Sequence, residues 1–207
     1  MICEVINNRK IKNMRKEVAY DKAKWHFNSD KFPADLPVEN GYTHIAFFLR
    51  WCIEKDFLNP VEFSEQALEK ISLIKEGLFD CREFLVKWID GCLLSSLLNE
   101  AGQEFADNYY QSEKYKLKTC LKNWHFFYLD DIWYYQKNKK MTYTKVNQKG
   151  AFYSIENTEH NYQIIKKAID RRYKIFLDMK SGKIGNNPIQ SLFSGIRINW
   201  DSFKRKK

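Results

Sequence analysis

The chain has 207 residues, 44% of them hydrophobic and 16% aromatic, with 8 Gly and 4 Pro, a composition that excludes disordered and collagen-like proteins. No apolar run approaches the roughly 20 residues of a membrane-spanning helix, and the N-terminal segment lacks a secretory signal pattern, so we expect a cytoplasmic protein. Charge is divided along the chain: residues 1–107 carry 14 Lys and Arg against 18 Asp and Glu, whereas residues 108–207 carry 21 against 8. This division predicts a positive field over one part of the surface.

The chain contains five cysteines, and none of them forms a CxxC pair. An odd number cannot pair completely within one chain, and Cys52, Cys81 and Cys120 lie among apolar neighbours. We therefore expect reduced, core-packed thiols and a reducing compartment.

Three helices are expected in the acidic half. Tyr42–Phe57 has apolar residues at i, i+3, i+4, i+7 and i+8, the spacing of one buried helical face, and an Asn-Pro pair ends it. Ser64–Lys75 begins at a capping serine. Asp80 and Glu83 form a capping box that begins the third helix, and Gly91 ends it.

The basic half is expected to be largely helical as well. After a short turn at Leu93–Leu98, Asn99 is a good N-cap for a fourth helix. Helical spacing resumes over the aromatic stretch Leu117–Tyr135 and is strong over Thr158–Met179, whereas residues 136–156 are polar and indicate a loop or a small hairpin. The sequence therefore predicts a mainly α fold, a single compact domain of about six helices with a small irregular or β-hairpin segment.

The domain organisation follows from the same patterns. We expect an N-terminal arm over residues 1–19, the helical domain over residues 20–180, and a basic C-terminal extension over residues 181–207.

A polar and aromatic group lies at the start of the domain and contains Asp21, Trp25, His26 and His44. Histidine and aspartate together can form a metal site or an acid–base pair. The spacing of His26 and His44 matches neither the HExxH motif nor a structural zinc site, and His44 shares a helix face with aromatic residues. We therefore expect a structural polar cluster, with no catalytic residue, no metal and no cofactor.

The basic half also interleaves cations with aromatic side chains. Arginine recognises carboxylates through paired hydrogen bonds, and aromatic rings anchor interfaces, so this pattern favours a surface for an acidic protein. The same pattern suits single-stranded nucleic acid, with cations for phosphates and rings for bases. The expected partner-binding residues are Trp133, Tyr134, Lys137, Lys139, Lys140, Arg171, Arg172 and Lys174.

Three segments carry a resemblance to a known family. They read YDKAKWHF over residues 20–27, FPADLP over 32–37 and GYTHIAFFLRWC over 41–52. They resemble a family of small uncharacterised bacterial proteins whose members read YDxAxWHY, then FPxDLPxE, then THIGMFLAWC. The similarity continues weakly through residues 20–180.

The resemblance implies a compact cytoplasmic domain and no known reaction. Proteins of this family are similar in size and general character to immunity proteins, which neutralise a cognate toxin. The comparison is an analogy only. The chain departs from the pattern in its arm before Tyr20, in a lysine-rich stretch at about 111–125, and in its tail after Lys180.

Three functional hypotheses follow. The first is a bacterial immunity protein that binds an acidic face of a toxin domain through the basic, aromatic surface. The second is a nucleic-acid-binding protein. The third is a hydrolase-like enzyme that uses the His/Asp cluster. None of them needs a membrane, and none specifies an oligomeric state.

Overall fold

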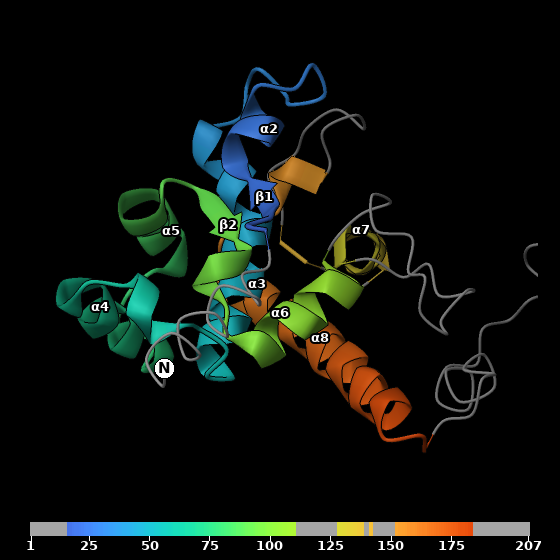
Figure 1. Ribbon diagram of the computed structural model, residues 1–207. Helices are drawn as coiled ribbons and strands as arrows, with labels where there is room; N and C mark the ends of the chain where they lie inside the picture. Colours follow the sequence, from blue (N-terminus) through green and yellow to red (C-terminus); the bar gives the residue numbers. More distant parts are fainter. Residues whose placement is uncertain (1–15, 111–127, 139–140, 143–151, 184–207) are drawn as a thin grey trace, which may run out of the picture.

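The computed structural model describes residues 16–110, 128–138, 141–142 and 152–183 of the chain, and Figure 1 shows their arrangement. The fold is mainly helical with a small antiparallel β element, as the sequence predicts. Helix α3 (Thr43–Glu54) lies at its centre and contacts α4 (Glu65–Lys75), α5 (Cys81–Ile89) and α8 (Glu159–Lys180). Within the described ranges, no helix combines the length and apolar character that crossing a membrane requires.

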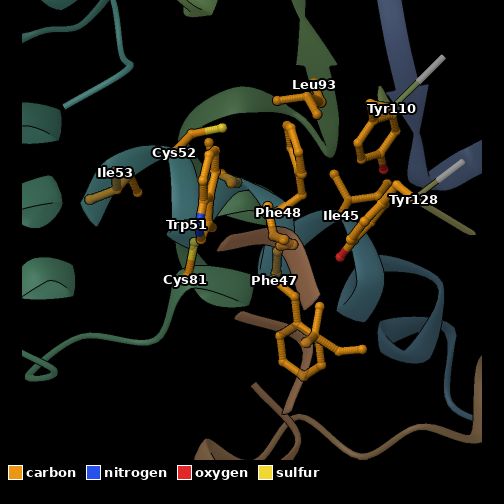
Figure 2. Packing of buried hydrophobic residues seen from close by; sticks show 14 of the residues in the cluster. Ile45, Phe47, Phe48, Trp51, Cys52, Ile53, Cys81, Leu93, Tyr110 and Tyr128 are labelled. Carbon is orange, nitrogen blue, oxygen red and sulfur yellow. The ribbon is translucent and has the colours of Figure 1, made fainter. Parts of the chain in front are cut away.

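Helix α3 is buried around most of its circumference. The predicted face, which includes Phe48 and Cys52, is fully inside, and Phe47 and Trp51 on other faces are at most 3% exposed. Figure 2 shows these side chains directed into different parts of the core. A helix that is apolar all round is stable only when other elements cover every side, which explains its central position.

Local capping signals set where three helices begin. Ser64 Oγ accepts a hydrogen bond from the backbone of Ala67 at 3.3 Å at the start of α4, and Asp80 Oδ1 accepts one from Glu83 at 2.8 Å at the start of α5. Asn99 caps α6 (Glu100–Tyr109) in the same way, at 3.0 Å. Each cap satisfies a backbone N–H that the helix itself leaves without a partner, and all three predicted starts are confirmed.

The β element joins segments that are far apart in sequence. Strand β1 (Ala19–Lys22) pairs antiparallel with β2 (Cys92–Leu94), and Ala19 lies opposite Leu94. The turn predicted at Leu93–Leu98 is therefore partly a strand, followed by the 3₁₀ turn η3 (Ser95–Leu97). Two further 3₁₀ turns are η1 (Val38–Tyr42) and η2 (Pro60–Glu62).

The short helix α2 (Ala23–Phe27) follows directly on β1. The backbone N–H of Ala23 donates to the carbonyl of Gly91 at 2.9 Å. Gly91 has φ +64°, and a Cβ there would lie 2.7 Å from the ring of Tyr42. Glycine is therefore required where α5 turns into β2 beside α2.

The C-terminal part differs from the prediction in its boundaries. Helix α7 (Tyr128–Asn138) continues past residue 135, where a loop was expected, because the polar residues 136–138 complete its last turn. Thr158 caps α8, whose predicted inner face is confirmed by buried Tyr162, Ile165 and Ile169. The 117–127 part of the predicted aromatic helix, the 143–151 part of the predicted loop or hairpin, residues 1–15 and residues 184–207 lie outside the described residues.

The described cysteines are free thiols, as expected. Cys52 and Cys81 are buried and Cys92 is half-buried. Burial raises the pKa of Cys52 and of Cys81 well above the ordinary value, so both remain protonated, as small core side chains do.

Candidate metal centre

Three adjoining elements bring Asp21, His26 and His44 together. Asp21 lies on β1, His26 on α2 and His44 in the first turn of α3. Pairing of β1 with β2 fixes the position of Asp21, and α2 follows β1 directly, so that His26 lies beside His44 of α3. The structure therefore assembles three of the four residues of the predicted polar cluster.

The fourth residue of the predicted cluster, Trp25, does not join it. Its side chain is 53% exposed, and the ammonium of Lys22 lies 5.7 Å from the ring centroid. Neighbours on a short helix point about 100° apart, so the position next to His26 faces solvent.

The two imidazole rings and the carboxylate lie close together, and we call this group the Asp21–His26–His44 centre. Asp21 Oδ1 lies 2.7 Å from His26 Nε2, and Asp21 Oδ2 lies 3.2 Å from His44 Nε2. The two Nε2 atoms are 3.1 Å apart. One potential ligand atom from each of the three residues therefore lies within 4.8 Å of the other two.

Further hydrogen bonds fix the orientation of each side chain. Tyr110 donates its hydroxyl hydrogen to Asp21 Oδ2 at 2.8 Å, and the backbone N–H of Lys22 donates to Oδ1 at 2.8 Å. The hydroxyl of Tyr153 lies 3.3 Å from His26 Nδ1. Tyr128 donates to the backbone carbonyl of His44 at 2.6 Å, and its ring stacks on Tyr110 with centroids 5.0 Å apart, two rings that Figure 2 shows beside α3.

Burial and mutual contact set the charge of the centre. Burial acts to raise the pKa of Asp21, but hydrogen bonds from His26 and His44 outweigh it and hold that pKa well below its ordinary value. Burial lowers the pKa of His44, against the opposing effect of its contact with Asp21. At neutral pH the centre therefore contains an ionised carboxylate and a neutral imidazole, the states in which both bind metals.

The three short contacts of the centre cannot all be hydrogen bonds. Each Nε2 carries at most one hydrogen, so at most two of the three short contacts are hydrogen bonds. The remaining contact therefore joins two donors or two acceptors. A cation held between the three side chains would replace these contacts with bonds to their lone pairs.

The dimensions suit a first-row transition metal. Metal–ligand bonds of about 2.0–2.1 Å place the ligand atoms of a tetrahedral site about 3.3 Å apart. The two Nε2 atoms are 3.1 Å apart, close to this separation, and they lie 2.7 and 3.2 Å from different oxygens of Asp21. The carboxylate would therefore bind an ion through both oxygens or turn to present one of them. Two imidazoles and one carboxylate are a common ligand set for zinc and for non-haem iron.

Tyr110 and Tyr153 belong to the site, and sequence reasoning missed them. They lie 89 and 127 residues from their respective partners Asp21 and His26. Tyr110 appears in the sequence as one of two tyrosines with helical spacing, which core packing explains equally well. No local signal separates these two tyrosines from the other ten.

The predicted partner surface is described only in part. Arg172 donates to both carboxylate oxygens of Asp131 at 2.6 and 2.7 Å, and Arg171 donates to the hydroxyl of Tyr135 at 3.0 Å. Lys174 and Tyr134 are exposed. Lys139 and Lys140 lie outside the described residues, as do the side chains of Trp133 and Lys137.

The comparisons with known proteins are consistent with the resemblance seen in the sequence. Residues 19–131 match the family described as a domain of unknown function, DUF7832. No curated protein and no solved structure matches the chain. The matched region contains all three residues of the Asp21–His26–His44 centre and covers more than half of the chain. The chain therefore belongs to the DUF7832 family.

Proposed function

We propose that this protein binds one divalent transition-metal ion, such as zinc, at the Asp21–His26–His44 centre. The observation that carries the proposal is the convergence of two Nε2 atoms and a carboxylate, each within 3.2 Å of the other two. The sequence expectation of no metal rested on linear spacing, which does not apply to ligands that come from three separate elements.

The surroundings support the proposal. Metal-bound histidines donate their second ring N–H to a nearby acceptor, and the Tyr153 hydroxyl occupies that position for His26. Ligand carboxylates are themselves hydrogen-bonded, as Asp21 is by Tyr110. These contacts orient the ligands before an ion arrives, which lowers the entropic cost of binding it.

A metal titration tests the proposal. Purified protein is freed of metal with a chelator, dialysed, and titrated with zinc in a calorimeter. We expect one ion per chain for the wild type and an affinity lower by about a hundredfold or more for His26→Gln, which removes one ligand. His26 is the variant of choice because its side chain is 14% exposed, whereas that of His44 is 3% exposed.

A second histidine on the surface provides the control. His160 is exposed in the first turn of α8, so His160→Gln should leave zinc binding unchanged. Far-UV circular dichroism shows whether each variant is folded. Absence of zinc binding by folded wild-type protein contradicts the proposal, and so does equal binding by wild type and His26→Gln.

A second candidate function is the immunity-protein hypothesis, in which a toxin domain docks on the basic half. Its support is the exposed surface of α7 and α8, where Tyr134 is 45% exposed and its ring contacts Tyr135, the partner of Arg171. Arg172 supports it less, because its guanidinium is paired with Asp131. Co-purification from the native host tests this: a stoichiometric acidic partner is expected, and none would contradict it.

A further inference from the structure

We propose that the metal ion at the Asp21–His26–His44 centre keeps one exchangeable coordination position, on the side of His26 and Tyr153, which takes water or a small oxyanion. This inference rests on the proposed function, because it concerns the same ion. It goes further because it assigns the centre to the class of catalytic metal sites rather than structural ones.

The number of ligands is the first argument. Structural zinc sites are closed by four protein ligands, whereas catalytic sites use three and leave a position for water or substrate. Among the residues that the structure describes, three His, Cys, Asp or Glu side chains converge here: Asp21, His26 and His44. Three such ligands leave at least one position for a small molecule.

Unequal exposure of the three ligands is the second argument. The side chains of His44 and Asp21 are 3% and 7% exposed, whereas that of His26 is 14% exposed. Tyr153, at the other nitrogen of His26, is half-buried. His26 is therefore the one of the three side chains nearest to solvent, and Tyr110 and the core cover Asp21 on the other side.

Aromatic rings line the same side. The ring of Phe152 lies 4.9 Å from that of His44, and the ring of Phe32 lies 4.9 Å from that of Tyr153. Apolar neighbours lower the local dielectric, which strengthens the attraction between the ion and an anionic ligand. The position therefore suits a compact oxyanion such as a carboxylate or a hydroxamate.

An exchangeable position of this kind supports hydrolysis. An ion held by Asp21, His26 and His44 would lower the pKa of a bound water molecule to about 7 and so supply a nucleophile at neutral pH. In such a hydrolysis the water oxygen would form a bond to the carbonyl carbon of an ester or amide, the bond from that carbon to the leaving group would break, and the water proton would pass to the leaving group. No other reactant is needed.

Cobalt spectroscopy tests the inference. Cobalt(II) takes the place of zinc in such sites and has visible absorption bands that depend on its ligands. Full-length protein is loaded with one equivalent of cobalt, and acetohydroxamate is then added in steps. We expect a saturable change in the position and intensity of the bands. Metal-free protein with the same additions is the control and should show no band.

The outcomes separate this inference from the proposed function. Cobalt binding followed by a saturable spectral change supports both. Cobalt binding with a spectrum that acetohydroxamate leaves unchanged, together with X-ray absorption showing four protein ligands, overturns the open position and leaves the metal site in place. Failure of cobalt and zinc to bind overturns both.

Discussion

Replacing Arg172 by methionine should destabilise the protein strongly, because it leaves the buried carboxylate of Asp131 without its cation. Asp131 is 6% exposed and accepts two hydrogen bonds from Arg172 and one from the hydroxyl of Tyr109, at 2.8 Å. Removing one partner of a buried ion pair costs about 3–5 kcal/mol. In a protein of this size that corresponds to a fall in Tm of about 6–20 °C.

The matched control is Lys174→Met, which removes a cation from the same helix at an exposed position. It should change the free energy of unfolding by no more than about 0.5 kcal/mol. Urea denaturation followed by circular dichroism measures both variants. Adding Asp131→Asn to Arg172→Met should recover part of the loss, because a neutral amide is cheaper to bury than a carboxylate. An Arg172→Met protein within about 1 kcal/mol of wild type refutes the reasoning.

Three further predictions concern stability, and urea denaturation measures all of them. Gly91→Ala should lower the free energy of unfolding by more than about 2 kcal/mol, because Gly91 has a positive φ and an added Cβ would lie 2.7 Å from a neighbouring ring. Gly77 also has a positive φ but open space around it, so Gly77→Ala should cost about 1 kcal/mol. Equal costs for the two variants would be inconsistent with the packing. Asn161→Ala should cost about 3 kcal/mol, because its fully buried amide donates to two backbone carbonyls and accepts from one backbone N–H; a loss below 1 kcal/mol would contradict this. Burial acts to raise the pKa of Glu159, but the contact with Arg50 outweighs burial and lowers that pKa. The ion pair therefore stabilises the protein above about pH 4.3, the pKa of glutamate in the unfolded chain. The stabilisation is lost as the pH falls through the lower pKa of the folded state. Because Glu159 is exposed, Glu159→Gln should cost at most about 1 kcal/mol at pH 7, and the cost should shrink as the pH is lowered. A cost that does not change with pH would rule out the ion pair as its origin.

The helices were predictable where their signals are local. Ser64, Asp80 and Asn99 each act on a backbone N–H three residues away, so their role is visible in a short window of sequence. The pairing of β1 with β2 was not predicted, because Ala19 and Leu94 lie far apart in the sequence. A three-residue strand such as Cys92–Leu94 carries too little alternation to be recognised.

The centre was half predictable for a similar reason. Asp21, His26 and His44 stood out as residue types, yet their linear spacing argued against a metal site. What brings them together is the order of β1, α2 and α3 in space, which depends on the pairing of β1 with β2. The tyrosines that hydrogen-bond to these side chains come from still more distant segments, so they carried no signal.

Anomalous X-ray diffraction from a zinc-soaked crystal tests the central claim most directly. The account predicts one anomalous peak at the zinc edge, about 2.0–2.1 Å from His26 Nε2, from His44 Nε2 and from a carboxylate oxygen of Asp21. Well-ordered side chains at the same three positions with no peak between them, at saturating zinc, would contradict it.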